Sequence, residues 1–205
     1  MNPNTSRVEF YFDCSSPWTY LAFQAFNQSP DFQACEVIWK PVLVGGVFNA
    51  VNPSVYEARA NPVPVKQRYY AKDLQDWARY VGVEIGNPPV FPVNSVKVMR
   101  GAFVAIEEDV LVPYAMEAFR RYWGELRDIS QDREVNEIAR AAGLDQEAFW
   151  DKINDQAYKS RLRSTTQELI DRGGFGSPTL FLNDDDMYFG NDRLVLAAAA
   201  VRSAN

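Results

Sequence analysis

The sequence contains no histidine among its 205 residues. This absence excludes the Ser-His-Asp and Cys-His catalytic groups, in which an imidazole activates the nucleophile. It also removes the commonest side-chain ligand of zinc sites. Any general acid, general base or nucleophile must therefore come from serine, threonine, tyrosine, lysine, a carboxylate or a bound cofactor.

Cysteine is scarce, since only Cys14 and Cys35 are present. They form no Cys-x-x-Cys motif and have no metal-site spacing, and each is expected at the edge of a strand as a small buried hydrophobe. The acidic run at residues 184–186 lacks the spacing and the glycine of a calcium loop, so a solvated turn is expected there. The sequence therefore predicts no metal site.

Long hydrophobic runs are also lacking: no segment approaches the ~20 apolar residues of a membrane span. The first ten residues, MNPNTSRVEF, have neither the basic nor the apolar region of a signal peptide. A formal net charge of −6 and an isoelectric point near 4.8 disfavour unspecific nucleic-acid binding, which normally needs a basic surface. We therefore expect a soluble cytoplasmic protein.

The stretch at residues 7–21, RVEFYFDCSSPWTYL, organises the rest of the chain. Residues 8–12 are an apolar and aromatic run typical of a buried central strand. Pro17 fits the first turn of a helix, which places Ser16 at the N-cap, at the carboxyl end of that strand. Free backbone N–H groups and the helix dipole favour an anion there. The alternative interpretation of Ser16 is an ordinary helix cap.

The order of elements predicts the fold class. A strand, a helix and a second strand at residues 36–44 form a βαβ unit with a parallel strand pair. A proline-rich loop is expected at residues 48–64, and helical periodicity continues to residue 154. A further helix, a hairpin of two strands and a last helix complete the chain. This order indicates an α/β thioredoxin-like fold, with residues 1–64 and 155–205 in one domain and residues 65–154 as an inserted helical domain.

Five motifs in the same order resemble 2-hydroxychromene-2-carboxylate isomerases and kappa-class glutathione transferases, which belong to the DsbA-like branch of the thioredoxin superfamily. The motifs are Phe10-Tyr11-Phe12-Asp13 with Ser16-Pro17-Trp18-Thr19-Tyr20-Leu21, Pro64-x-Lys66 with Tyr69, Phe91-Pro92-x-Asn94-Ser95, Gly176-Ser177-Pro178-Thr179, and Phe189-Gly190-Asn191-Asp192-Arg193-Leu194. Residues 16–19 stand where dithiol oxidoreductases of this fold carry Cys-x-x-Cys. The resemblance therefore implies that glutathione supplies the reactive sulfur.

The resemblance makes Ser16 the catalytic partner of that sulfur. A serine hydroxyl without a base is a poor nucleophile but a good hydrogen-bond donor to a thiolate. Such a bond contributes about 1.5–3 kcal/mol, enough to lower the pKa of a thiol by roughly 1–2. The N-terminus of the helix also lowers the pKa of a thiol beside it.

Other roles are also implied by the resemblance. The backbone of Ser177, before a cis Pro178, is expected to pair with glutathione like an added strand. Asn191 and Asp192 are expected to hold the γ-glutamyl end of glutathione, and Lys66 a carboxylate of glutathione or substrate. Trp18 and Asn94 are candidates to line the substrate side of the site. Either Asn52 or Asn61 is expected to contact glutathione, and the sequence does not distinguish between them.

The function implied is a glutathione-dependent isomerase of 2-hydroxychromene-2-carboxylate or similar aromatic 2-oxo-acids, acting as a homodimer. In the prototype reaction, 2-hydroxychromene-2-carboxylate interconverts with trans-o-hydroxybenzylidenepyruvate. A second interpretation is a kappa-like glutathione transferase or peroxidase, which would use the same glutathione site. A third is a thioredoxin-fold binding module without catalysis, and a dithiol oxidoreductase that uses Cys14 is the fourth.

Overall fold

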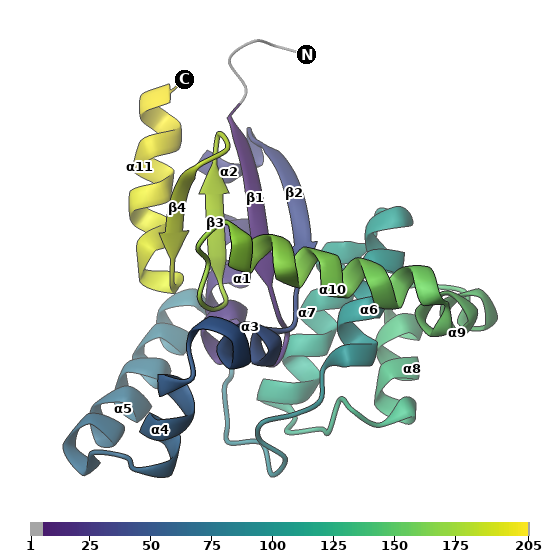
Figure 1. Ribbon diagram of the computed structural model, residues 1–205, viewed down its shortest axis with the longest axis horizontal. Coiled ribbons are helices and arrows are strands. Elements are labelled where there is room, and N and C mark those ends of the chain that lie inside the picture. Colours follow the sequence, from purple (N-terminus) through teal and green to yellow (C-terminus); the bar gives the residue numbers. More distant parts are fainter. Residues whose placement is uncertain (1–5, 205) are drawn as a thin grey trace.

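A four-stranded mixed sheet lies at the centre of the structure, a computed structural model that describes residues 6–204 (Figure 1). Its strand order is β2-β1-β3-β4. The strands are β1 (Arg7–Phe12), β2 (Glu36–Pro41), β3 (Thr179–Leu182) and β4 (Asp186–Phe189). Strand β1 pairs parallel with β2 and antiparallel with β3, and β3 pairs antiparallel with β4. The predicted thioredoxin-like arrangement, with its βαβ unit and its hairpin, is confirmed.

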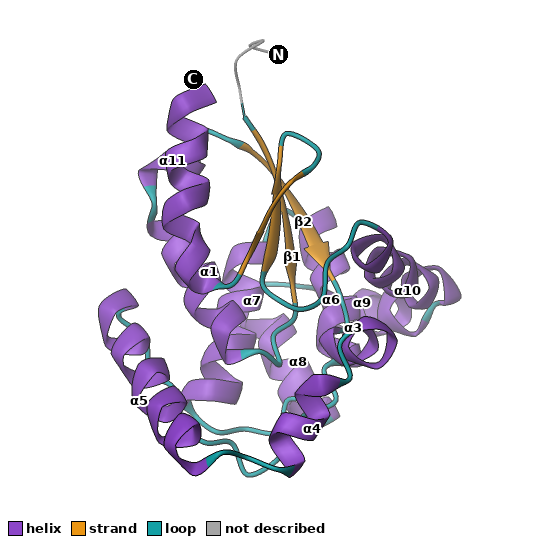
Figure 2. Cartoon of the chain, turned by 60° about the vertical axis from the view of Figure 1, so that its left-hand side comes forward, coloured by secondary structure: helices purple, strands orange, loops and turns teal. Residues whose placement is uncertain are grey.

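The helices cover the two faces of the sheet and extend from its lower end. They are α1 (Pro17–Gln28), α2 (Pro30–Gln33), α3 (Val44–Val51), α4 (Ser54–Ala60), α5 (Pro64–Val81), α6 (Val96–Glu107), α7 (Leu111–Phe119), α8 (Asp132–Ala141), α9 (Gln146–Asn154), α10 (Gln156–Asp171) and α11 (Leu194–Ala204). A π-helical turn, η1 (Arg120–Gly124), follows α7, and a 3₁₀ turn, η2 (Asn191–Arg193), precedes α11. Helices α1 and α11 lie on one side of the sheet and α3 and α10 on the other (Figure 2).

The alternation of side chains along β1 explains why both faces of the sheet are covered. Phe10 and Phe12 are fully buried on the α1 side, where they contact the ring of Phe23. Tyr11 is buried on the opposite side with Phe181 and with Leu169 of α10. Because β1 is buried on both faces, its sequence is a continuous apolar run interrupted only by Glu9.

Helices α5 to α9 fill the expected insertion, residues 65–154, although the division of the chain into two domains stays a prediction. One continuous core includes residues of both parts, such as Phe12 beside the sheet and Phe149 in α9. At Gly101 of α6 a Cβ would lie only 2.1 Å from the Tyr114 hydroxyl, so glycine permits the close packing of α6 against α7 and α9.

The turn η1 connects the helical part to the loop after β1. Its Trp123 Nε1 donates a hydrogen bond of 3.1 Å to the Cys14 carbonyl. Single π-helical turns re-aim side chains in this way and often occur beside functional sites. This bond fixes the backbone two residues before Ser16.

The expectation of a loop at residues 48–64 is wrong, because helices α3 and α4 occupy most of it. The second strand also ends at Pro41, earlier than expected. Gly45 and Gly46 lie inside α3, where Gly46 approaches Thr166 of α10 and a Cβ would lie 3.4 Å from its methyl group. Tertiary contact with α10 thus outweighs the low helix propensity of two glycines.

Charged side chains form a network between the sheet and α10. Lys40 donates to both oxygens of Glu168, at 2.9 and 3.1 Å, and Tyr11 donates to Glu168 at 2.9 Å. Arg172 contacts the buried Glu9 and the Tyr11 hydroxyl. Burial alone would raise the pKa of Glu168, but the bonds from Lys40 and Tyr11 prevail and the pKa lies below its ordinary value.

This pKa shift predicts a small loss of stability in acid. A carboxylate whose folded pKa is depressed stabilises the fold above its unfolded pKa and loses that contribution as pH falls through the folded pKa. Glu168→Gln should cost about 0.5–1 kcal/mol near pH 7, the range of partly exposed ion pairs, and much less at pH 3. Urea unfolding at both pH values measures this. Glu36→Gln, which changes an exposed carboxylate at the start of β2, serves as the control. An equal effect of Glu168→Gln at both pH values would contradict the linkage.

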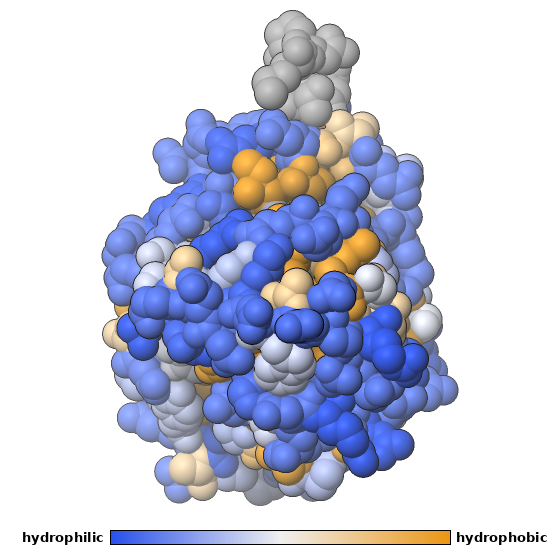
Figure 3. Space-filling view, turned by 90° about the vertical axis from the view of Figure 1, so that its right-hand side faces the viewer, coloured by the Kyte–Doolittle hydropathy of each residue, from blue (hydrophilic) through white to orange (hydrophobic). Residues whose placement is uncertain are grey.

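The outer face on the side of α9 and α10 is mostly hydrophilic, with a few apolar side chains between charged ones (Figure 3). Within residues 6–204, none of the helices is both long and apolar enough to span a bilayer. The same residues contain no group of three or more Cys, Asp or Glu side chains arranged to hold a metal ion.

Candidate functional site

Ser16 lies at the N-cap of α1, as predicted. Its Oγ accepts a hydrogen bond of 3.2 Å from the Thr19 N–H and donates one of 3.1 Å to the Ser177 carbonyl. Ser16 is 8% exposed, so its hydroxyl is nearly enclosed. The hydroxyl therefore caps the helix and at the same time connects it to the loop before β3.

The Ser177–Pro178 peptide bond is cis, as expected. The Ser177 side chain is held from two sides: its Oγ accepts from the Asp13 N–H at 3.1 Å and lies 2.8 Å from the Thr19 hydroxyl. Among residues 6–204, the Ser177 N–H has no hydrogen-bond partner. The backbone at Ser177 can therefore accept a further extended peptide, with one donor available and one carbonyl that is bonded only by a side chain.

The buried carboxylate of Asp13 connects the loop before Ser16 to the start of α3. Its Oδ1 accepts from the Ser15 N–H and its Oδ2 from the Val44 N–H at the start of α3, both at 2.9 Å. Burial raises the pKa of Asp13, and the two backbone bonds oppose that shift. From the sequence alone, Asp13 has no assigned role beyond its place in the first motif.

A cavity of about 580 Å³, here called the Ser16 cavity, opens beside the start of α1. It lies between α1, α3, α4 and the loop that precedes α6. The side chains that line it include Asp13, Ser16, Trp18, Phe48, Asn52, Tyr56, Arg59, Phe91, Asn94 and Ser177. Aromatic rings, among them those of Trp18, Phe48 and Phe91, form part of its walls, so it suits a flat apolar group with a small number of polar contacts.

A second cavity of about 500 Å³, the Asp192 cavity, begins on the other side of Trp18 and Ser177, which line both. Its lining consists of Trp18, Tyr70, Asp73, Trp77, Ser177, Pro178, Phe189, Gly190, Asn191 and Asp192. Ser177 is thus one of three residues, with Trp18 and Phe189, that line both cavities. An extended tripeptide that pairs with Ser177 could therefore occupy the Asp192 cavity while its central residue faces the Ser16 cavity.

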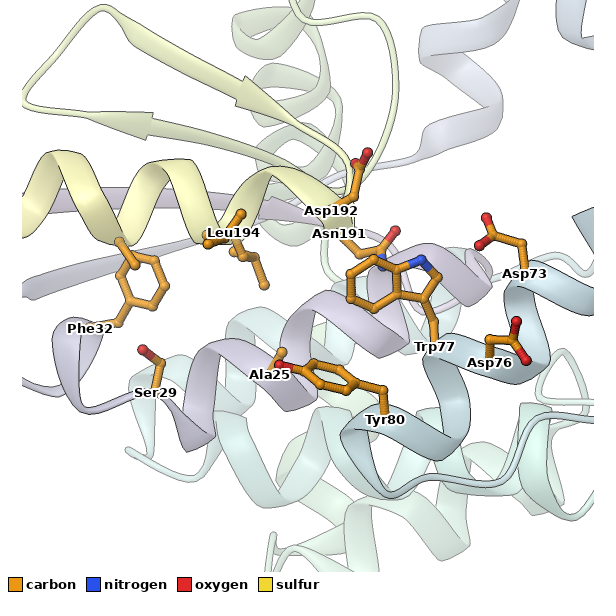
Figure 4. Close-up of a pocket in the computed structure, with 12 residues that line it drawn as sticks. Ala25, Ser29, Phe32, Asp73, Asp76, Trp77, Tyr80, Asn191, Asp192 and Leu194 are labelled. Carbon is orange, nitrogen blue, oxygen red and sulfur yellow. The ribbon is translucent and has the colours of Figure 1, made fainter.

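A groove of about 670 Å³, the Tyr80 groove, continues from the Asp192 cavity between α5 and α11. Figure 4 shows Asn191 beside the indole of Trp77, with Asp192 and Asp73 at the same end. Asn191 is 9% exposed, and its Nδ2 has no hydrogen-bond partner among the described residues. A buried amide donor without a partner is costly, so a bound acceptor is expected to complete this site.

The structure brings most of the predicted residues together. Ser16, Trp18, Asn94 and Ser177 line the Ser16 cavity, and Pro178, Asn191 and Asp192 line the neighbouring one. Asn52, but not Asn61, lines the Ser16 cavity, and its Nδ2 donates to the Phe175 carbonyl at 3.1 Å. Lys66 lies exposed in the first turn of α5 and lines neither cavity.

The cysteines lie apart from this chemistry. Cys14 is fully buried, and both burial and the neighbouring Asp13 raise the pKa of its thiol. Cys35 is half-buried and its sulfur donates to the Asp31 carbonyl at 3.4 Å. A raised thiol pKa keeps Cys14 protonated and unreactive, which disfavours a dithiol oxidoreductase.

Comparison with known proteins agrees with this geometry. Residues 7–202 match the family described as DSBA-like thioredoxin domain. The chain is 32% identical to 2-hydroxychromene-2-carboxylate isomerase of Pseudomonas putida, with 95% of this chain and 93% of that protein covered. It is 26% identical to glutathione S-transferase kappa 1 of Caenorhabditis elegans, with 96% and 91% covered.

The fold supports the relationship to 2-hydroxychromene-2-carboxylate isomerases. The solved structure of a selenomethionine-labelled 2-hydroxychromene-2-carboxylate isomerase superimposes with a TM-score of 0.81 at 28% identity, and covers 96% of this chain and 95% of that one. These relatives are isomerases and glutathione transferases, and hence enzymes. The chain thus belongs to the DSBA-like thioredoxin family, among the relatives of 2-hydroxychromene-2-carboxylate isomerases and kappa-class glutathione transferases.

Proposed function

We propose that this protein is a glutathione-dependent isomerase of 2-hydroxychromene-2-carboxylate or a similar aromatic 2-oxo-acid. One observation carries the proposal: the Ser16 hydroxyl donates to the carbonyl of Ser177, 3.1 Å away, directly before the cis proline. A peptide that pairs with the Ser177 backbone takes over this carbonyl. The Ser16 O–H is then released to donate to whatever side chain the peptide presents beside it.

The residues present fit glutathione. Its cysteine backbone would pair with the N–H and C=O of Ser177, which places the thiol next to Ser16. Its γ-glutamyl end would reach Asn191 and Asp192, where the free Nδ2 of Asn191 can donate to the carboxylate and Asp192 can bind the ammonium. The unpartnered Asn191 amide supports this placement independently of Ser16.

Bound glutathione would supply a thiolate that adds reversibly to the conjugated double bond of the substrate, which allows rotation about that bond. Ser16 stabilises the thiolate by its hydrogen bond, and the N-terminus of α1 favours the same negative charge. The aromatic walls of the Ser16 cavity orient the substrate ring and exclude water. Ser16 does not attack the substrate, since no base lies within hydrogen-bond distance of its Oγ among the described residues.

The direct test is conversion of 2-hydroxychromene-2-carboxylate to trans-o-hydroxybenzylidenepyruvate, followed by absorbance, with and without glutathione. Turnover that requires glutathione supports the proposal, and turnover at the same rate without it refutes the proposed role of the tripeptide. Calorimetry with glutathione alone separates the binding step from the reaction. A binding module without catalysis would give no turnover with any substrate.

Asn191→Ala is expected to weaken glutathione binding about tenfold without lowering stability. The variant loses a hydrogen bond to a charged group of the ligand, but the free protein loses no bond, since Nδ2 has no partner there. Calorimetry gives the dissociation constant, and thermal unfolding without ligand gives the stability.

Asn136→Ala is the matched control for this change. Asn136 of α8 accepts a bond of 3.2 Å from Trp150, so its replacement should lower stability and leave glutathione binding unchanged. The opposite pattern, in which Asn191→Ala destabilises the free protein and binds glutathione normally, would make Asn191 a structural residue only.

A second candidate is a kappa-like glutathione transferase or peroxidase. The similarity to glutathione S-transferase kappa 1 over nearly the whole chain favours it, and the same two cavities would serve. Rates with chlorodinitrobenzene, with cumene hydroperoxide and with the chromene, measured on one preparation, distinguish the two activities. The substrate with the highest kcat/KM identifies the function.

A further inference from the structure

Arg59 is the feature of the Ser16 cavity that the family resemblance does not explain. It lies near the end of α4, between the two asparagines Asn52 and Asn61 that were considered for glutathione contact. The Cζ atom of its guanidinium lies 5.0 Å from the ring centroid of Phe91 and 5.7 Å from that of Phe48. Both rings line the cavity, so these cation–π contacts hold the guanidinium against its wall.

The charges around the cavity leave this cation available. Asp13 and Arg59 are the two charged residues among those that line it. Asp13 is buried and its oxygens are bonded to the N–H groups of Ser15 and Val44. Among the described residues, no carboxylate lies within ion-pair distance of Arg59, and no hydrogen-bond acceptor is within reach of its guanidinium. Five N–H donors are therefore available to a ligand.

The net charge of the whole protein disfavours an anionic substrate, so a local cation would assist its binding. The chain carries a formal net charge of −6, which repels small anions in general. A guanidinium binds a carboxylate with two parallel hydrogen bonds, a geometry that lysine does not provide. The rings of Trp18, Phe48 and Phe91 supply flat apolar walls in the same cavity.

We propose that Arg59 binds the carboxylate of a planar aromatic acid whose ring lies against these walls, and so selects carboxylate-bearing substrates. This inference adds the residue that binds the substrate carboxylate in the proposed isomerase and to that extent rests on the proposed function. It assigns to Arg59 the substrate contact that the sequence suggested for Lys66, which lines neither cavity. Arg59 is then a specificity-determining residue, while Ser16 acts on the sulfur.

The test measures binding without glutathione and without turnover. Chromone-2-carboxylate is the probe, because it is planar, stable and carries the carboxylate, and chromone-2-carboxamide is its neutral counterpart. Calorimetry is done on the wild type, on Arg59→Gln and on Arg59→Lys. Arg59→Gln should raise the Kd of the carboxylate about tenfold and leave that of the amide unchanged. Arg59→Lys should have an intermediate effect on the carboxylate, since it keeps the charge but not the paired donors.

Arg68→Gln is the matched control, because Arg68 is an exposed arginine of the adjacent helix α5 that lines neither cavity. It makes the same change in net charge and should leave both dissociation constants unchanged. Raising the salt concentration should weaken carboxylate binding in the wild type more than in Arg59→Gln. Circular dichroism shows whether each variant is folded; the exposed position of Arg59 predicts that all are.

Three results would overturn the inference: equal weakening of acid and amide in Arg59→Gln, the same weakening in Arg68→Gln, or no binding of the acid to the wild type at millimolar concentration. These results are separate from the fate of the proposed function. If the chain shows no glutathione-dependent turnover but Arg59→Gln still loses carboxylate binding selectively, the isomerase proposal fails and the assignment of Arg59 stands.

Discussion

Ser16→Ala is expected to lower kcat/KM at pH 7 about 10–100-fold while glutathione still binds. The hydroxyl contributes about 1.5–3 kcal/mol to a thiolate acceptor, and its loss raises the pKa of the bound thiol by roughly 1–2. The thiolate fraction at pH 7 falls by the same factor. The defect should therefore shrink as pH rises toward 9, because the bound thiol of the variant ionises there. Profiles of kcat/KM from pH 6 to 9 measure the size of the defect and its pH dependence. Calorimetry shows whether the variant still binds glutathione.

The helix-capping role of Ser16 must be separated from this effect. Its Oγ accepts from the Thr19 N–H, so the alanine variant also loses an N-cap, which costs about 1 kcal/mol. Asp145 caps α9 in the same way, with a bond of 2.8 Å to the Ala148 N–H. Asp145→Ala should lose similar stability and keep full activity, while Ser16→Thr should keep both the cap and the rate. If kcat/KM of Ser16→Ala depends on pH in the same way as that of the wild type, a role of Ser16 in thiol ionisation is excluded.

The sequence was sufficient for β1, α1 and the N-cap because short-range patterns determine them. A continuous apolar run, small polar residues and a proline at the first helical position leave one arrangement for residues 8–28. The contact between Ser16 and Ser177 was not predicted; the family resemblance only assigned both residues to the same glutathione site. The contact depends on the antiparallel pairing of β1 with β3, between residues more than 160 positions apart.

Helices α3 and α4 could not be predicted, for two different reasons. In α3 the close approach to α10 stabilises a helix that contains Gly45 and Gly46. In α4 there is no apolar stripe to recognise, because none of its residues is buried. Both helices form walls of the Ser16 cavity. Because α4 was not predicted, Tyr56 and Arg59 were not identified as candidate site residues from the sequence.

Pattern reasoning also missed Asp13, since a carboxylate after a strand is most often exposed. Only the structure shows that its two oxygens accept from the N–H groups of Ser15 and Val44. Its place in the first motif was the one sequence feature that pointed to Asp13, and the motif gave no function for it. In the structure, the Asp13 carboxylate holds the start of α3 against the loop before α1.

Asp13→Ala is therefore expected to have the largest effect on stability, about 3–5 kcal/mol. Two backbone N–H groups, a buried one at Val44 and a partly buried one at Ser15, would lose their acceptor, at about 1–3 kcal/mol each, which is a large share of the total for a domain of this size. Glutathione binding should weaken as well, because the Asp13 carboxylate holds the loop that precedes Ser16 against α3. Asp171→Ala, at the exposed end of α10, should change neither quantity.

Asp13→Asn distinguishes the hydrogen bonds from the charge. Its amide oxygen keeps one acceptor, and the change removes a buried charge that is costly, as the raised pKa of Asp13 shows. A carboxyl whose folded pKa is raised loses stability as pH increases from its unfolded pKa through its folded one. The stability deficit of Asp13→Asn relative to the wild type should therefore be larger at pH 4 than at pH 7, in urea unfolding at both. A deficit that grows with pH would mean that the ionised carboxylate is favoured in the fold, and that its bonds to the backbone outweigh its burial.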